Sequence, residues 1–397
     1  MIKHIRKEKT GLFATLLILM LSMSMILTAC ADTENQKAAN EPAQTEMQLF
    51  AGGSGTDDDP YQIEIAEQMD HIRENLEASY VLTADIDLSG YENWQPIGEF
   101  QPKSDAPEDA EVPKDEVAFR GTFDGNGHTI SDLTIDAPQG MAVGLFGCAT
   151  GTEEAKGYIR NFTLENVDIS GAYLVGGAVG LQFMNFEVEG IKLSGTNKLS
   201  GLQGVGGIVG TGFDWIRDCS AAADITILGD DGACAGSIAG GTTFSSIENC
   251  IAENGSITAE GHACWGFGGI CGAPYAASEI SNCKVTNVTI DITGDDGRLI
   301  GGVVGFAGTY TDDTAAEISN CTVQDMVISV SDTTTCVGGI LGGPEEESEG
   351  SDIMSHYKVK NCSVSGTISG GKGNIGSIAG DATNAEELDC TGEMAIQ

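Results

Sequence analysis

The sequence predicts an all-β fold, a right-handed parallel β-helix (solenoid), from two recurring patterns. A Gly-framed apolar block returns every 30 to 38 residues and ends at Gly147, Gly180, Gly210, Gly240, Gly272, Gly305, Gly342 and Gly380. Between the blocks a second phrase returns, as in Ile280-Ser281-Asn282-Cys283. A unit this small cannot bury its own apolar face, so the units must stack on one another. We expect three short strands per coil, joined by right-handed crossovers.

The first thirty residues (1–30) have the pattern of an export signal. Four basic residues between positions 3 and 9 precede an uncharged apolar stretch over 11–29. The stretch ends in Leu27-Thr28-Ala29-Cys30, which resembles the bacterial lipobox, whose Cys is lipidated and becomes the new N-terminus. We therefore predict a lipid anchor on Cys30, with the membrane as partner and the protein on the extracellular side of the cell membrane. An uncleaved membrane anchor is the alternative.

The remaining chain divides into three parts. Residues 31–50 are polar and aperiodic, which predicts a flexible tether. Residues 51–140 are expected to form an N-terminal cap and the first coils, with a short capping helix over 65–76 whose apolar residues have helical spacing. An acidic, Pro-containing stretch at 99–118 is expected to form an exposed loop. Residues 141–397 carry the repeats.

Two columns of the repeat suit a stacked coil. Asn occupies one turn position at 161, 249, 282, 320 and 361, with Asp218 and Asp389 in its place elsewhere. Asn tolerates the left-handed conformation of a tight corner, and its amide can bond from coil to coil. The next position holds Phe162, Ile191, and then Cys219, Cys250, Cys283, Cys321, Cys362 and Cys390. We expect this second column to point inward as unpaired, buried thiols rather than disulfides, because stacked Cβ atoms lie ~4.8 Å apart.

Composition and motif content exclude several functions. The chain has 19 Lys+Arg against 59 Asp+Glu, a formal charge of −40, which predicts no binding to nucleic acid. The five His are scattered and no Cys-x-x-Cys pair occurs, so we expect no metal and no cofactor. We also expect no sheet column to repeat a charged residue. With no local motif for nucleophilic catalysis, no catalytic residue is predicted.

One set of aromatic residues is the candidate ligand-contact strip. An aromatic follows each of five Gly blocks by three to five residues: Phe183, Phe213, Phe244, Tyr275 and Tyr310. Exposed on one edge, these rings would offer flat apolar faces to a glycan or a protein. The alternative is a stack in which each ring covers a coil corner and rests on the next ring.

The Gly-framed blocks and the Ile-x-Asn-Cys phrase resemble the GLUG motif of repeat-containing bacterial surface proteins. Gly144-Leu145-Phe146-Gly147 matches the motif name literally, and the other blocks match it more loosely. The resemblance covers about residues 50–390. It implies a β-helix similar to the pectin-lyase architecture, on an exported protein often linked to adhesion, and it implies no catalytic residues.

Three functions remain open at this point. The first is a membrane-anchored, extracellular, adhesin-type binding protein that contacts a glycan or the surface of a host or neighbouring cell and has no catalytic activity. The second is a carbohydrate-active enzyme, a polysaccharide hydrolase or lyase, on the same fold. The third is a structural spacer, which burial of the aromatic residues would favour.

Overall fold

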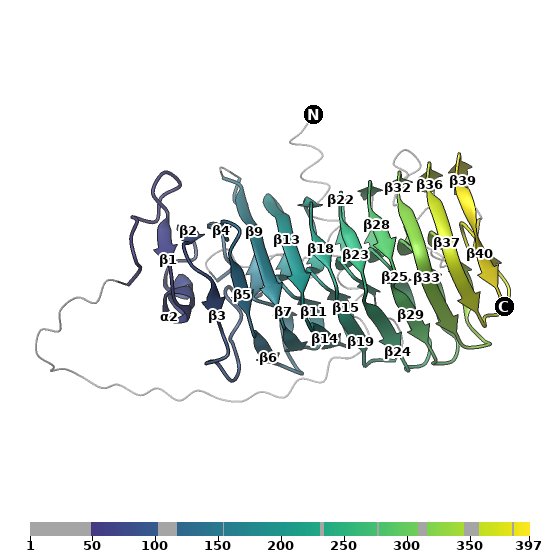
Figure 1. Cartoon of the computed structure of the whole chain (residues 1–397), viewed down its shortest axis with the longest axis horizontal. Coiled ribbons are helices and arrows are strands. Elements are labelled where there is room, and N and C mark those ends of the chain that lie inside the picture. Colours follow the sequence, from purple (N-terminus) through teal and green to yellow (C-terminus); the bar gives the residue numbers. More distant parts are fainter. Residues whose placement is uncertain are drawn as a thin grey trace, which may run out of the picture.

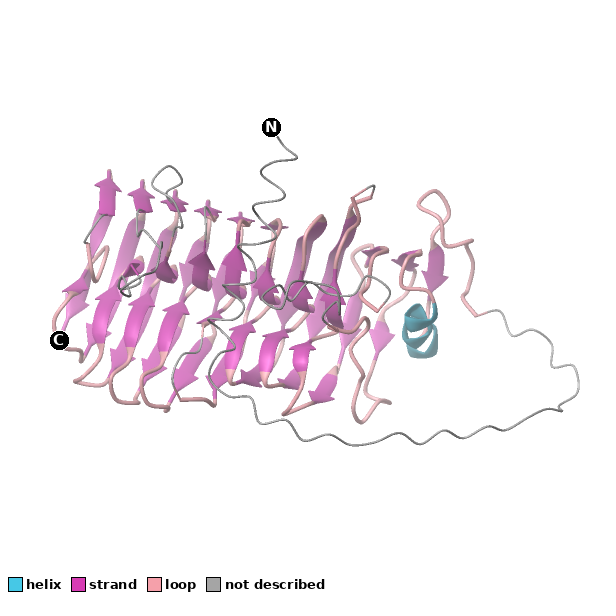
Figure 2. Ribbon diagram, turned by 180° about the vertical axis from the view of Figure 1, so that it is seen from behind, coloured by secondary structure: helices cyan, strands magenta, loops and turns pink. Residues whose placement is uncertain are grey.

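The computed structural model describes residues 49–101, 117–153, 155–230, 234–275, 278–308, 316–344, 357–382 and 385–397. Cys30, most of the tether, residues 102–116 of the acidic loop, and Tyr310 lie outside these ranges. The chain folds as the predicted right-handed parallel β-helix, a rod of stacked coils with the N-terminal cap at one end (Figure 1). The rod consists of strands joined by loops and turns, and the single helix lies at the capped end (Figure 2).

The largest sheet has 25 strands and begins with a ladder that runs the full length of the rod. This first ladder comprises β1 (Tyr61–Ile63), β2 (Ser79–Leu82), β4 (Thr122–Asp124), β9 (Gly157–Glu165), β13 (Phe186–Ser194), β17 (Ile216–Arg217), β22 (Ser246–Glu248), β27 (Glu279–Ser281), β32 (Ala316–Ser319), β36 (Tyr357–Lys360) and β39 (Ala385–Leu388).

Two further ladders of the same sheet lie beyond successive corners. The second comprises β3 (Ile86–Asp87), β5 (Thr129–Ser131), the later halves of β9 and β13, β18 (Ser220–Ala221), β23 (Ile251–Glu253), β28 (Lys284–Thr286), β33 (Thr322–Val330), β37 (Ser363–Ser369) and β40 (Thr391–Ile396). The third comprises β6 (Thr134–Asp136), β10 (Asp168–Ser170), β14 (Lys198–Gly201), β19 (Asp224–Ile227), β24 (Ser256–Ala259) and β29 (Thr289–Ile292), which pairs with β33.

Two smaller parallel sheets complete each coil. The 8-stranded sheet comprises β7 (Met141–Val143), β11 (Tyr173–Gly176), β15 (Gln203–Gly206), β20 (Ala235–Gly236), β25 (Trp265–Gly268), β30 (Arg298–Gly301), β34 (Thr335–Gly338) and β38 (Ile375–Gly376). The 7-stranded sheet comprises β8 (Phe146–Ala149), β12 (Val179–Gln182), β16 (Val209–Gly212), β21 (Ala239–Thr243), β26 (Cys271–Tyr275), β31 (Val304–Ala307) and β35 (Leu341–Pro344). The three strands expected per coil therefore correspond to the three sheets. Within the largest sheet, however, corners divide each coil further, so that this part of the coil contributes to more than one ladder.

The Gly blocks make the bend between the two smaller sheets. A Cβ on Gly210 would lie 2.4 Å from the backbone carbonyl carbon of Leu174, and one on Gly240 would lie 2.5 Å from that of Gly204. Consecutive coils approach so closely here that only Gly fits. This packing explains why the block recurs.

The predicted Asn column forms the first corner. Asn161, Asn249, Asn282, Asn320 and Asn361, with Asp218 and Asp389, all have φ between +50° and +58°. The side chains bond between coils: the Asn249 amide donates to Asp218 Oδ1 at 3.1 Å, and the Asn361 amide donates to Asn320 Oδ1 at 3.3 Å. A second column at Asn166, Asn254 and Asn287 forms the next corner in the same way, with Asn287 donating to Asn254 at 2.9 Å. This second column was not predicted from the sequence.

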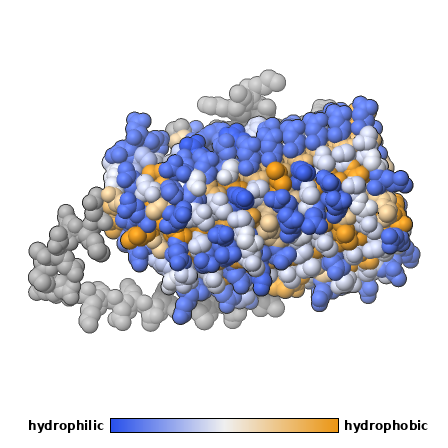
Figure 3. All heavy atoms as spheres, viewed as in Figure 1, coloured by the Kyte–Doolittle hydropathy of each residue, from blue (hydrophilic) through white to orange (hydrophobic). Residues whose placement is uncertain are grey.

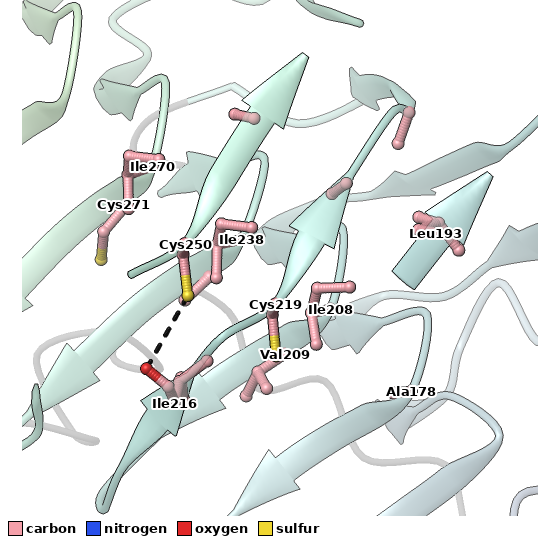
Figure 4. Close-up of a cluster of buried hydrophobic side chains, with 14 of the residues drawn as sticks. Ala178, Leu193, Ile208, Val209, Ile216, Cys219, Ile238, Cys250, Ile270 and Cys271 are labelled. Carbon is pink, nitrogen blue, oxygen red and sulfur yellow. Dashed lines mark hydrogen bonds between the residues drawn. The ribbon is translucent and has the colours of Figure 1, made fainter. Parts of the chain in front are cut away.

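The interior changes in character along the rod. In the first coils it is filled by rings, with Phe119, Phe123 and Phe146 fully buried and the rings of Phe123 and Phe162 meeting edge to face at 5.6 Å. In later coils the same column holds cysteines that point inward (Figure 4). Five of these six thiols are buried, Cys390 is half-buried, and none of the six forms a disulfide, as predicted for the column.

From Cys250 onward, each thiol of this column contacts two main-chain carbonyls, whereas Cys219 contacts one, Arg217 O at 3.2 Å. The Cys250 thiol donates to Glu248 O at 3.3 Å within its own coil, and it lies 3.8 Å from Ile216 O of the preceding coil (Figure 4). Cys283, Cys321 and Cys362 repeat both contacts. Cys suits this position because it is apolar enough to be buried and still satisfies a carbonyl turned inward next to the left-handed corner.

The cap is shorter than the predicted helix. α2 (Ala66–Asp70) is followed by a 3₁₀ turn, η1 (His71–Glu74). Met69 and Ile72 are fully buried against the first coils, as a cap requires, whereas Ile65 lies before the helix and is exposed. No helix within the described residues is long and apolar enough to cross a membrane.

Candidate binding face

The predicted aromatic strip is mostly buried. Phe183 and Phe213 are each 9% exposed, and their ring centroids lie 5.2 Å apart. Tyr275 is 4% exposed and meets the Phe306 ring edge to face at 4.7 Å. Phe244 is half-buried and packs against both groups. Burial of these rings corrects the expectation of an exposed strip and favours the alternative, a stack that covers the coil corners.

A different set of side chains gathers on the outer face of β9, β13 and the start of β17. Each of these three stacked segments is one rung of the first ladder. On each rung, two outward-pointing residues flank one buried residue. Strand register places the three pairs next to one another. We call this set the binding face, and it consists of Tyr158, Arg160, Glu187, Glu189, Trp215 and Arg217.

Trp215 is 40% exposed and is the one exposed aromatic side chain of the described ranges. Its main chain is held by buried neighbours, since the Gln182 amide donates to Trp215 O at 3.0 Å and to Phe186 O at 2.6 Å. The Trp215 N–H in turn donates to Asp214 Oδ1 at 2.9 Å. The ring is therefore presented from a fixed corner.

Ion pairs connect the rungs of the binding face. Arg217 contacts Glu187 and Glu189 at 3.2 Å each, and Lys156 contacts Glu187 at 2.6 Å. Arg160 pairs with Asp124 on the preceding rung at 2.9 Å. The charges alternate in sign from coil to coil, so the face holds its long side chains in place without a large net charge.

Each aromatic residue of the face lies beside an arginine. The Arg160 guanidinium carbon lies 4.1 Å from the Tyr158 ring centroid, and that of Arg217 lies 6.0 Å from the Trp215 ring. Tyr158 and Trp215 are two rungs apart, about 10 Å along the rod at the spacing of parallel strands. The face thus presents two aromatic–arginine pairs with two carboxylates between them.

This face was not predicted from the sequence, and the expectation that no sheet column repeats a charged residue was wrong. Asp124, Arg160, Glu189, Arg217 and Glu248 occupy successive rungs of one outward column. A signal was present in the sequence, because Tyr158-Ile159-Arg160 and Trp215-Ile216-Arg217 share the order aromatic, Ile, Arg. Only the register of the rungs shows that these triplets lie on one surface.

Asp214 is the titratable group that lies closest to Trp215 in the chain. Burial raises the pKa of its carboxyl above the usual range, and the nearby Glu187 charge adds to this effect, while the Trp215 N–H and Lys156 oppose it. Among the described residues no cluster of three or more His, Cys, Asp or Glu could hold a metal ion.

Comparisons with known proteins agree with this architecture. Residues 296–329 match the family model described as the GLUG motif, over β30, β31, β32 and most of β33. The chain is therefore a GLUG-containing parallel β-helix. The matched segment lies several coils away from the binding face.

Two curated relatives share part of the sequence. Halomucin of Haloquadratum walsbyi is 36% identical over 164 residues, which cover 40% of this chain and 2% of halomucin. A protein of Evansella cellulosilytica described as a Gly-rich membrane protein is 32% identical over 145 residues, which cover 34% of this chain and 15% of that protein. The chain thus spans only a small part of either relative.

Two solved structures are similar in shape. One, described as an immunoglobulin A1 protease from Bacteroides ovatus, has a TM-score of 0.49 at 22% identity and aligns 75% of this chain with 87% of that one. The other, described as an IgA1 protease, has a TM-score of 0.44 at 15% identity and aligns 81% of this chain with 22% of that one.

Proposed function

We propose that the protein is a membrane-anchored, extracellular β-helix that binds a glycan through the binding face and catalyses no reaction. The observation that carries this proposal is the exposed Trp215 ring, held on the same outer face as Tyr158 and next to ion-paired Arg and Glu side chains. Elsewhere in the described residues, aromatic rings are buried or half-buried.

The chemistry of the face suits a sugar chain. Ring faces pack against the C–H faces of sugars, and the Arg and Glu side chains can exchange hydrogen bonds with hydroxyl groups. The spacing of about 10 Å between Tyr158 and Trp215 is comparable to a disaccharide unit of an extended glycan. Opposite charges alternate on the face, which favours a neutral ligand over a strongly acidic one.

The location rests on the sequence and on the relatives. The lipobox-like segment ending at Cys30 supports export and lipid anchoring. The description of the Evansella protein as a membrane protein supports a membrane or surface location. Figure 3 shows hydrophilic side chains over most of one long side of the rod, with small apolar patches between them, as suits a rod surrounded by water.

A glycan panel tests the proposal. The chain from residue 31 onward would be compared with Trp215→Ala and Tyr158→Ala, and with Ile251→Ala as a control of similar exposure at 39%. We expect the parent and the control to bind at least one glycan, and each aromatic variant to bind at least tenfold more weakly. Equal binding by all four proteins, each with intact circular dichroism, would contradict this role for the face.

A hydrolase remains the second candidate because of one observation. Asp214 has a raised pKa and lies close to Glu187, and two carboxyl groups in unlike environments are the usual arrangement in glycoside hydrolysis. New reducing ends released from the panel by the parent and not by Asp214→Asn would favour the enzyme over the binding protein.

A further inference from the structure

The Asn column of the first corner is interrupted at one coil. Strand register places Gly190 opposite Asn161, where the neighbouring coils have Asp218 and Asn249. Gly190 keeps the left-handed backbone of the column, with φ of +62°, but it has no side chain. The corner is therefore complete in its backbone and lacks one amide.

The missing side chain leaves a groove at this corner. It has a volume of about 400 Å³ and is lined by Asp124, Asn126, Asn161, Thr163, Gly190 and Lys192, among others. A volume of this size falls within the usual range for small-ligand sites. A Cβ placed on Gly190 would lie 3.0 Å from Asn161 Oδ1, so a side chain there would occupy the groove.

Two polar groups of the groove are unused. At two other places in the column the amide donates to the preceding oxygen, as Asn249 does to Asp218 and Asn361 to Asn320, whereas Asn161 Oδ1 accepts no hydrogen bond from the described residues. Lys192 is exposed and makes no ion pair within the described ranges. The groove thus offers an acceptor and a donor to an incoming group.

The carboxylate of the groove is already fully engaged. Asp124 Oδ1 accepts from the Asn126 N–H at 2.8 Å and from the Asn161 amide at 3.3 Å, and Oδ2 pairs with Arg160 at 2.9 Å. With Arg160 and Lys192 close by, this carboxylate is a poor ligand for a cation. Because Arg160 also belongs to the binding face, the groove and that face are contiguous.

We propose that the groove binds the hydroxyl groups of one sugar residue of a neutral oligosaccharide. Asn161 Oδ1 would accept from one hydroxyl, and Lys192 and the Thr163 hydroxyl would bond to the adjacent ones. This inference rests on the proposed function, since the rest of the oligosaccharide would lie over Tyr158 and Trp215. Gly190 is then a specificity residue, because its lack of a side chain creates the subsite.

Gly190→Asn tests this assignment, because Asn tolerates the left-handed backbone and would complete the column. We expect the thermal midpoint to be unchanged or higher, and the affinity to fall at least tenfold, when isothermal titration is run with the hexasaccharides of β-linked glucose, xylose, mannose and N-acetylglucosamine. Gly373→Asn is the matched control, since Gly373 has φ of +70° and open space around it, far along the rod. It should bind as the parent does.

The outcomes separate the two proposals. Loss of binding in both Gly190→Asn and Trp215→Ala supports the groove. Retained binding in a folded Gly190→Asn, with loss in Trp215→Ala, overturns the groove and leaves the proposed function standing. A parent that binds none of the four hexasaccharides overturns the groove as a neutral-sugar subsite. If Gly190→Asn does not fold, Lys192→Met and Thr163→Val decide the question, and unchanged affinity in both would overturn the inference.

Discussion

The first coils and the later coils fill the same interior column with different side chains. In the first coils the column begins with Phe162, whose ring meets Phe123 edge to face inside a group of buried rings. From Cys219 onward it holds a small thiol in every coil, and each thiol bonds at least one inward-facing carbonyl. The interior of the capped end is therefore packed with interlocking aromatic rings. The interior of the later coils is packed with one small side chain that repeats in every coil.

This difference shows how a solenoid can combine non-repeating first coils with repeating later coils. Interlocking rings bury a large apolar area in one place, and they cannot be exchanged between coils. The thiols bury less area per residue, but each coil contributes an equal share to an interface with its neighbours. Substitutions in the two regions should therefore differ in how much they lower the free energy of unfolding and in how many coils they destabilise.

Removal of a ring from the first coils should have the largest effect. Phe123→Ala would leave a cavity among Phe146 and Phe162, and we expect a loss of about 3–5 kcal/mol in the free energy of unfolding. Cys283→Ala, the matched change in the later coils, should cost much less. Hydrogen exchange measured coil by coil would show how far each loss of stability extends. Equal losses in the free energy of unfolding for the two variants would contradict the expected difference between the regions.

Alkaline pH should destabilise the protein through its buried thiols. Burial raises the pKa of Cys148 and of Cys271 to about 12, from an ordinary value of 9.0. Between these values the unfolded chain has lost the protons and the folded chain keeps them, so stability is full below pH 9 and falls as the pH rises. We expect a loss of about 1.4 kcal/mol for each such thiol by pH 10.

Urea midpoints measured from pH 7 to 10 would test this slope. Cys148→Ala with Cys271→Ala should flatten it, although both variants lose stability at pH 7. Native thiols should also react slowly with thiol reagents at pH 8 and fully in urea. Rapid labelling of Cys148 or Cys271 in the folded protein would show that these two thiols are open to solvent.

The corners should respond more weakly than the core. Asn249→Ala places a Cβ-bearing residue without an amide at φ of +55° and breaks the bond to Asp218, which should cost about 1–2 kcal/mol. In Asn249→Gly the backbone still adopts the positive φ without strain, and only the amide is removed, as at Gly190. This variant should therefore lose less stability than Asn249→Ala. A glycine variant as unstable as the alanine one would show that the amide, not the backbone, holds the corner.

The smallest effect is expected at Asp214. Its raised pKa means that ionisation opposes folding, so stability should fall as the pH rises from the ordinary carboxyl pKa to the raised one and stay level above it. Asp214→Asn should raise the thermal midpoint slightly at pH 7 and leave it nearly unchanged at pH 3. A lower midpoint at pH 7 would indicate that the carboxylate is needed to hold the Trp215 corner.

Local repetition made most of the fold predictable. The Asn column, the inward cysteines and the Gly bends recur in the sequence, and each has a single physical role that a stacked coil requires. The second column at Asn166, Asn254 and Asn287 was also accessible, since each member follows the first column by five residues. In other coils this position is not Asn, as at Gly195, and these interruptions obscured the pattern.

The candidate site was less predictable because it depends on contacts between coils. Nothing around Phe183 or Phe213 in the sequence shows that Leu174 and Leu181 cover their rings. Trp215 follows Phe213 by two residues, yet it points outward. The groove is harder still to foresee, since it arises from the absence of one side chain at Gly190 and becomes visible only when Asn161 lies opposite.

The repeated columns also have a consequence for how the chain finds its register while folding. If two later coils paired one repeat out of step, Asn would still meet Asn and Cys would still meet Cys, so the error would cost little energy. The ring-filled coils admit no such slip, because Phe123 and Phe162 have no equivalents farther along. We expect folding to begin at the capped end, which then sets the alignment of every coil that follows.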